Sequence, residues 1–94
     1  MNRLPQIISC NSTLETVQSV YRKKLPNGCF EILLTLVGKP NRIAFQAEEA
    51  ISFLRKGALI TVHSHCEFIC IEKGDKLSKN GEVKTFTFYK RYSH

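Results

Sequence analysis

The stretch FQAEEAISFLRKGALITVHSHC, residues 45–66, decides the fold, because its apolar residues change from a helical to an alternating spacing. The positions that fit one stripe of an α-helix are Ala47, Ala50, Ile51 and Leu54. Gly57 follows, where a left-handed residue commonly closes a helix. From Ile60 and Val62 onward the apolar residues alternate, as in a half-buried strand. The stretch predicts a short helix and then a long strand, which together plug one end of a small barrel.

Extended segments surround this stretch on both sides. Segments 4–11 and 14–23 form one bent strand or two, and the pattern leaves both open. Residues 29–37 alternate clearly, and residues 42–45 form a brief strand before the helix. The long strand is expected over about 58–71, a lysine-rich hairpin over 72–81 and the last strand over 83–92. Five strands with a helix between the third and fourth predict an all-β, five-stranded OB-fold barrel in a single domain, residues 1–94.

Composition narrows the class of protein. With 94 residues the chain suffices for one domain, and no apolar run is long enough to span a membrane. The N-terminus lacks the apolar core and cleavage site of a secretory signal, so a cytoplasmic location is expected. The net charge of +6 and pI near 9.4 favour a polyanionic partner, nucleic acid before a membrane surface. Solubility alone also explains a small basic domain.

The four cysteines, Cys10, Cys29, Cys66 and Cys70, are interpreted as reduced thiols, since nothing indicates a secreted disulfide framework. The run from His63 to Cys70 contains residue types that bind zinc. On one continuous strand, however, His63 and His65 face away from Cys66 and Cys70, so no metal site and no cofactor are expected. No set of nucleophile, base and orienting group stands out either, so the chain is not expected to be an enzyme.

Several motifs together resemble the single-stranded DNA-binding protein family of bacteria, plastids and mitochondria. They are Phe45, Ala47-Glu48, Leu54-Arg55-Lys56-Gly57 and Leu59-Ile60-Thr61-Val62, with weaker likeness at Met1-Asn2-Arg3, Gly28, Leu34-Thr35-Leu36 and Asn80-Gly81. The chain is most similar to short members, such as the primosomal replication protein N type and small cyanobacterial or plastid homologues. The resemblance implies single-stranded DNA binding in replication, recombination or repair. It also implies a homodimer or homotetramer assembled through strand edges, in the cytoplasm or an organellar stroma.

The chain departs from the family pattern in ways that affect function. The second hairpin shrinks to Gly38–Asn41, and the sequence has no tryptophan to stack on bases. It also lacks an acidic tail tip, so no partners are expected through such a tail. The alternative reading is therefore a protein-interaction module, a homo-oligomer or replication-complex partner that binds nucleic acid weakly or not at all.

A single-strand groove needs cations for phosphates and aromatic faces for bases. The candidate cations are Arg22, Lys23, Lys39, Arg42, Lys73, Lys76, Lys79 and Lys84. The candidate aromatic residues are Phe45 and Tyr89, with Tyr21 as a further exposed ring. Phe45 either stacks on bases or fills the core, whereas Phe86 and Phe88 are assigned to the core. Solubilising lysines on turns are the simpler explanation of the same cations.

Overall fold

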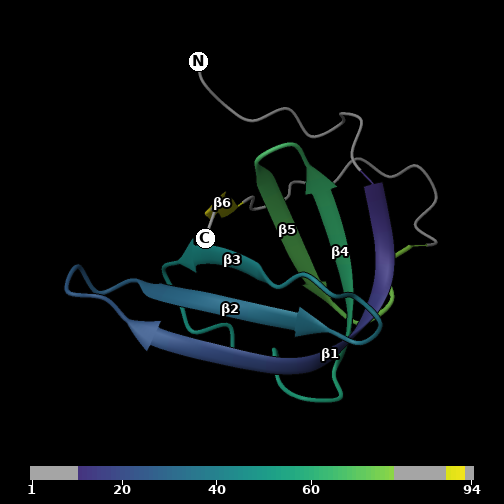
Figure 1. The fold of residues 1–94 in the computed structure, drawn as a ribbon, viewed down its shortest axis with the longest axis horizontal. Helices are drawn as coiled ribbons and strands as arrows, with labels where there is room; N and C mark the ends of the chain where they lie inside the picture. Colours follow the sequence, from purple (N-terminus) through teal and green to yellow (C-terminus); the bar gives the residue numbers. More distant parts are fainter. Residues whose placement is uncertain (1–10, 78–88, 93–94) are drawn as a thin grey trace.

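The computed structural model describes residues 11–77 and 89–92, which form a closed antiparallel β-barrel without a helix (Figure 1). The strands are β1 (Asn11–Lys24), β2 (Phe30–Leu36), β3 (Ile43–Ala47), β4 (Leu59–His65), β5 (Phe68–Lys73) and β6 (Tyr89–Tyr92). They follow one another around the barrel in the order β1-β2-β3-β6-β5-β4, and β4 pairs back onto β1. The predicted all-β barrel is confirmed and is compatible with an OB-like arrangement. The expected count of five strands and the expected helix are wrong for the described residues.

β1 is one bent strand that closes the barrel by pairing with two neighbours. Its first part, residues 11–16, pairs with β4, and its remainder pairs with β2. The register shifts between Val17 and Ser19, which is the mark of a β-bulge. Simple alternation puts Val17 and Tyr21 on the same face of the strand, but after the bulge each residue faces the opposite side. Val17 is 1% exposed in the core, and Tyr21 is 62% exposed.

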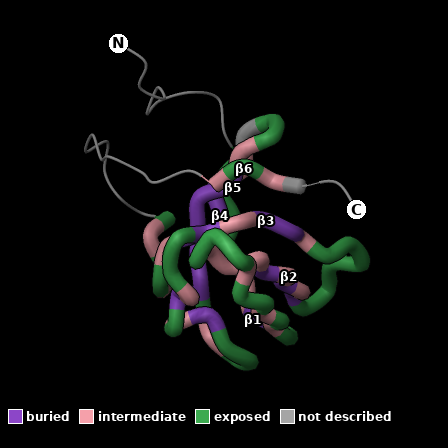
Figure 2. Tube along the Cα trace, turned by 90° about the vertical axis from the view of Figure 1, so that its left-hand side faces the viewer, coloured by how far each residue is buried: buried purple, intermediate pink, exposed green. Residues whose placement is uncertain are grey.

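The core consists of buried residues of the strands and of the loop between β3 and β4, and Figure 2 colours the buried stretches of the chain purple. Ile32, Leu34 and Leu36 of β2 are buried, as the alternation over residues 29–37 predicts. The loop between β3 and β4 contributes Ile51 and Leu54 to the same cluster. The loop therefore buries apolar side chains in the core, although it is not helical.

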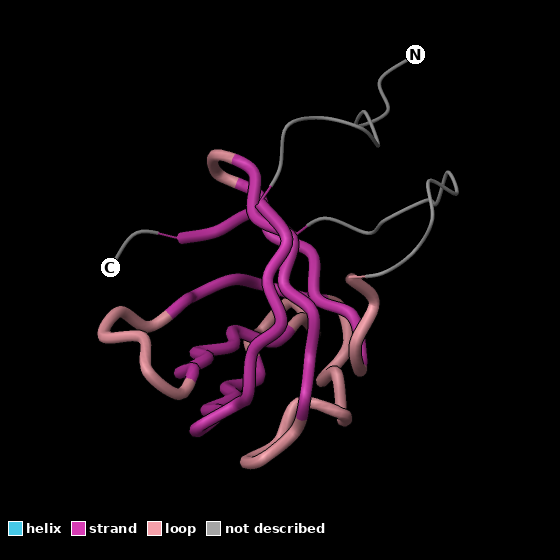
Figure 3. Tube along the Cα trace, turned by 90° about the vertical axis from the view of Figure 1, so that its right-hand side faces the viewer, coloured by secondary structure: helices cyan, strands magenta, loops and turns pink. Residues whose placement is uncertain are grey.

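Residues 48–58 form turns where the sequence predicts a helix (Figure 3). Ile51 has a φ of 54°, which interrupts a right-handed helix. The Leu54 N–H donates to the Ile51 carbonyl at 3.0 Å, and the Ala58 N–H donates to the Arg55 carbonyl at 2.9 Å. These are tight turns of the i to i+3 type rather than α-helical bonds. The apolar spacing correctly marked Ile51 and Leu54 as buried, whereas Ala50 is half-buried, and the spacing did not determine the backbone of the loop.

Arg22 explains how this loop satisfies its carbonyl groups without a helix. Its Nε donates to the Ala50 carbonyl at 2.6 Å, and its Nη2 donates to the carbonyls of Ile51 and Leu54, both at 2.7 Å. In an α-helix the Ala50 carbonyl would accept from the N–H of Leu54. The Arg22 guanidinium thus donates to carbonyls that helical N–H groups would otherwise reach, and it links the loop to β1.

The long strand expected over residues 58–71 is instead two strands, β4 and β5. The chain reverses at Cys66 and Glu67, and Cys66 has a φ of 45°. The reversal makes His63 and Cys70 directly opposite cross-strand partners. The expectation that these two side chains project to opposite faces is therefore wrong, because it assumed one continuous strand.

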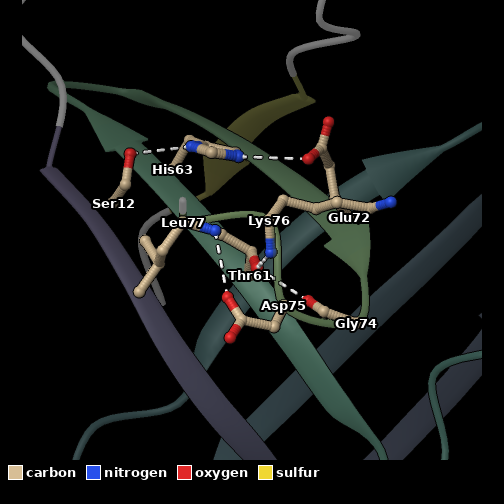
Figure 4. Close-up of polar contacts among 8 residues, drawn as sticks. All are labelled: Ser12, Thr61, His63, Glu72, Gly74, Asp75, Lys76 and Leu77. Atoms are coloured by element: carbon tan, nitrogen blue, oxygen red, sulfur yellow. Dashed lines mark hydrogen bonds and ion pairs between the residues drawn. The ribbon is translucent and has the colours of Figure 1, made fainter. Parts of the chain in front are cut away.

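The chain after β5 folds back over the outside of β4 (Figure 4). The Thr61 hydroxyl donates to the Gly74 carbonyl at 2.7 Å and accepts from the Lys76 N–H at 2.8 Å. Thr61 is consequently 0% exposed. Of the hairpin predicted over residues 72–81, the structure describes residues 72–77. Its remainder lies outside the described residues, as do Phe86 and Phe88, Cys10 and the predicted first segment apart from Asn11.

Cys29, Cys66 and Cys70 form no disulfide with one another. Among residues 11–77 and 89–92, no helix has the length and apolarity needed to traverse a bilayer.

Candidate nucleic-acid interface

The outer face of β1–β2–β3 carries a row of apolar side chains that runs across the strands. Tyr21 of β1 lies directly opposite Leu33 of β2, and Leu33 lies directly opposite Ala44 of β3. Directly opposite residues project to the same face of an antiparallel sheet. Leu33 is half-buried and Ala44 is buried, so the exposed Tyr21 ring is the accessible end of this row. The row gives a base one aromatic surface and an apolar floor.

Polar and charged residues flank the apolar row. On one side Lys23, Glu31 and Gln46 occupy opposite positions on the three strands. On the other side Ser19 lies opposite Thr35, and the exposed Arg42 comes immediately before β3. We call the rows together, from Tyr21 and Lys23 to Arg42 and Gln46, the β1–β3 platform. It combines an aromatic ring, hydrogen-bonding groups and two exposed cations, although the Lys23 charge has the Glu31 carboxylate as its cross-strand neighbour.

Phe45 belongs to the core and not to this platform. Its side chain is 0% exposed, and its ring centroid lies 5.2 Å from that of Tyr89, with the two planes tilted by 34°. The sequence left open whether Phe45 stacks on bases or fills the core, and in the structure it fills the core. Tyr89 is half-buried and packs against the same cluster. Neither ring presents an open face comparable to that of Tyr21.

Burial is the largest cause that raises the pKa of Tyr89, and negative charge at Cys70, Glu49 and Glu48 adds to it. The Tyr89 hydroxyl therefore stays neutral over the physiological range. Because Glu48 and Glu49 at the start of the loop contribute to the raised pKa, they lie within electrostatic reach of Tyr89 on β6.

The remaining candidate cations are distributed over several parts of the barrel. The Lys39 Nζ lies 3.5 Å from the Glu15 carboxylate, and both residues line a hollow of about 300 Å³. Lys73 is exposed at the end of β5, and Lys76 is half-buried. Lys79 and Lys84 lie outside the described residues. Arg22 retains the donors of its Nη1, but its other donors bind the loop carbonyls. Lys23 and Arg42 are thus the predicted cations that border the platform.

Several platform residues were not selected from the sequence. Leu33 and Thr35 have the strand parity opposite to the buried Ile32, Leu34 and Leu36, and this alternation is the signal that identifies them. In β3 both Ala44 and Phe45 are buried, so alternation does not identify Gln46. Tyr21 was recognised as an exposed ring, but the bulge that turns it onto this face leaves no mark in the sequence pattern.

A buried histidine joins β1, β4 and β5 on another side of the barrel (Figure 4). His63 Nδ1 shares a hydrogen bond of 2.8 Å with the Ser12 hydroxyl, and its Nε2 lies 3.6 Å from Glu72 Oε1. Although Cys70 lies opposite His63, no cluster of three or more metal-ligating side chains occurs in the described part of the chain. We assign this group to the packing of the three strands.

Comparisons of the chain with protein-family models, with curated proteins and with solved structures gave no match. The function of the chain is therefore inferred from its own residues and their geometry.

Proposed function

We propose that the chain binds single-stranded nucleic acid, DNA in preference to RNA, on the β1–β3 platform. The observation that carries the proposal is the Tyr21 ring, 62% exposed at the end of an apolar row. A base stacks on Tyr21 and extends over Leu33, while Lys23 and Arg42 attract the neighbouring phosphates. Every base has an aromatic face, so such a platform accepts single strands with little sequence preference.

The energetics of this site set the expected affinity. Stacking of one base on an aromatic side chain contributes about 1–3 kcal/mol. With one exposed ring among the described platform residues, charge attraction supplies much of the remaining affinity. Binding is accordingly expected to be modest at physiological salt and tighter at low salt. Replication, recombination and repair are the processes in which such an activity is used.

Fluorescence anisotropy with labelled oligo-dT and a matching duplex tests the proposal. Tyr21→Ala is expected to weaken oligo-dT binding by about 5–150-fold, which corresponds to the loss of one stacking contact. Val37→Ala removes another exposed apolar side chain, outside the platform, and serves as the matched control. The proposal is rejected if the single strand binds no more tightly than the duplex, or if the Tyr21 and Val37 variants behave alike.

A second candidate function is an interaction module that assembles into a homodimer or homotetramer, or docks on a replication protein. One specific observation favours it. β1 pairs with β4 only as far as Thr16, so the edge of its later part, residues 18–24, is not paired with β4. An unpaired strand edge is a template for another strand. Multi-angle light scattering distinguishes an oligomer from a monomer, and a monomeric mass would remove the homo-oligomer from consideration. We propose no catalytic activity.

A further inference from the structure

A second hollow, of about 750 Å³, lies where the loop of residues 48–58 meets the start of β4 and the end of β5. Arg55, Lys56 and Lys73 line it together with Phe53 and Leu59. Its volume is within the range of about 300–1,000 Å³ that is typical of small-molecule sites. None of its lining residues belongs to the β1–β3 platform, so it is a separate site.

Backbone hydrogen bonds hold the walls of this hollow in place. The Gly57 N–H donates to the Val17 carbonyl at 2.8 Å, and the Val17 N–H donates to the Ala58 carbonyl at 2.9 Å. The Gly74 N–H donates to the Leu59 carbonyl at 2.9 Å, which joins the end of β5 to the start of β4. These lining segments are therefore fixed to the barrel before a ligand arrives, which lowers the cost of ordering them on binding.

The described side chains that line the hollow carry a net positive charge. Its lining includes no acidic residue, and Arg55, Lys56 and Lys73 are all exposed. The acids that adjoin it in sequence contact other groups: Asp75 Oδ1 accepts the Leu77 N–H at 3.1 Å, and Glu72 Oε1 lies 3.6 Å from His63 Nε2. Charge complementarity thus selects an anion.

The hollow also has an apolar side, which distinguishes it from a simple patch of surface lysines. Phe53 packs against the core and lines the hollow as well, so its ring is anchored from behind. Leu59 also lines the hollow and is 45% exposed. A lining that combines cations with apolar side chains matches a ligand that carries both a phosphate and a flat organic group.

We propose that this hollow binds a nucleoside phosphate, with the phosphate held by Arg55, Lys56 and Lys73 and the base against Phe53 and Leu59. The ligand is either a free mononucleotide or one nucleotide of a bound strand, because both present the same chemistry. The inference goes beyond binding on the β1–β3 platform, since none of the platform residues takes part in it.

Titration of the ¹⁵N-labelled protein with dTMP, followed by the backbone amide signals, tests the proposal. The amides of Gly57 and Gly74 are expected to shift with dTMP, and to shift less at equal concentration with thymidine or with inorganic phosphate. The double variant Lys56→Gln/Lys73→Gln is expected to raise the Kd for dTMP at least fivefold. The double variant Lys24→Gln/Lys90→Gln removes the same charge outside the hollow and is expected to change it less than twofold.

Unshifted amides around the hollow, or an equal loss of dTMP affinity in both double variants, would overturn the proposal. A parallel titration with oligo-dT identifies the source of the nucleotide. If the Lys56/Lys73 variant also loses oligo-dT affinity, the hollow holds a unit of the strand; if it loses dTMP alone, the ligand is a free mononucleotide. The Tyr21→Ala variant is expected to keep its dTMP affinity, so a failure of this inference is distinguishable from a failure of the platform.

Discussion

At the scale of single residues, Arg22 is a cation whose side chain stabilises the fold. It was selected from the sequence as a phosphate contact, and its guanidinium donates to the carbonyls of Ala50, Ile51 and Leu54 at 2.6–2.7 Å. Hydrogen bonds from charged donors contribute about 1.5–3 kcal/mol each, and an acceptor left without a donor carries a further cost. The side chain is therefore expected to matter for stability before it matters for binding.

Arg22→Ala is expected to lower the free energy of unfolding by about 2–4 kcal/mol, because three loop carbonyls lose their donor. The unfolding free energy of Arg22→Lys should lie between those of the parent and of Arg22→Ala, since an ammonium does not reproduce the planar fork of the guanidinium. Urea denaturation measures both. Lys23→Ala, at the exposed neighbouring position, is the control and is expected to change stability by less than about 0.5 kcal/mol. Equal effects of the Arg22→Ala and Lys23→Ala changes would refute the structural role.

Tyr89 predicts a dependence of stability on alkaline pH. Burial raises its folded-state pKa above the ordinary value of 10.0, so the folded chain keeps this proton at a pH where the unfolded chain loses it. Its contribution is complete below pH 10.0 and disappears as the pH rises through the folded-state pKa. The difference in unfolding free energy between the parent and Tyr89→Phe should therefore be constant below pH 10.0 and change as the pH rises above 10.0. Chemical denaturation at stepped pH measures this, and a difference that stays constant throughout would contradict it.

The residues that sequence reasoning placed correctly are those set by local alternation. Ile32, Leu34 and Leu36 are buried as predicted, because nothing interrupts the alternation of β2. Phe45 could not be decided from its own neighbourhood, and it is the pairing of β3 with β2 and β6 that fixes its inward direction. The contacts of Arg22 are tertiary, spanning 28 to 32 residues, and no local pattern encodes them.

At the scale of elements, the differences from expectation concern connections and not burial. In the loop of residues 48–58, Ile51 and Leu54 are buried as a helical stripe would bury them. Apolar spacing reports which side chains leave water, and here turns achieve the same burial. The β4–β5 reversal at Cys66 and Glu67 contains none of the glycine, proline or asparagine residues that normally indicate a turn. The alternating pattern over residues 58–71 therefore predicted a single strand.

Thr61 connects two elements, and its loss should release the segment that follows β5. Thr61→Val keeps the shape of the side chain but leaves the Lys76 N–H and the Gly74 carbonyl without their partner. We expect a loss of about 1–3 kcal/mol in unfolding free energy and faster hydrogen exchange at the Lys76 amide. Thr35→Val makes the same chemical change at a half-buried position of β2 and should cost less than about 0.5 kcal/mol. An unchanged Lys76 exchange rate would contradict the assignment.

At the scale of the whole molecule, the net charge of +6 favours association with a polyanion before any specific contact forms. The barrel presents Lys23 and Arg42 on the same platform as Tyr21, and places Arg55, Lys56 and Lys73 around a separate hollow. The sequence established the excess of charge and the barrel class. It could not group these cations, because their grouping depends on the order of strands around the barrel.

The salt dependence of oligo-dT binding tests the role of Arg42. Each phosphate contact on a single strand contributes about 0.7 to the slope of the logarithm of the affinity against the logarithm of the salt concentration. Arg42→Gln is therefore expected to reduce the magnitude of this slope by about 0.7, whereas Lys90→Gln, on β6, should leave it unchanged. Anisotropy titrations at several salt concentrations provide the slopes. An identical slope for the parent and Arg42→Gln would exclude Arg42 from the phosphate contacts.

The closure of the barrel through β1 and β4 also has a consequence for the order in which the chain folds. Ser12 and His63, which share a hydrogen bond across this seam, are separated by 51 positions in the chain. The β2–β3 and β4–β5 hairpins, in contrast, join neighbouring segments. Bringing distant segments together carries a larger entropic penalty and slows folding. The hairpins are therefore expected to form early, and the joining of β1 to β4 to be the step that limits the folding rate.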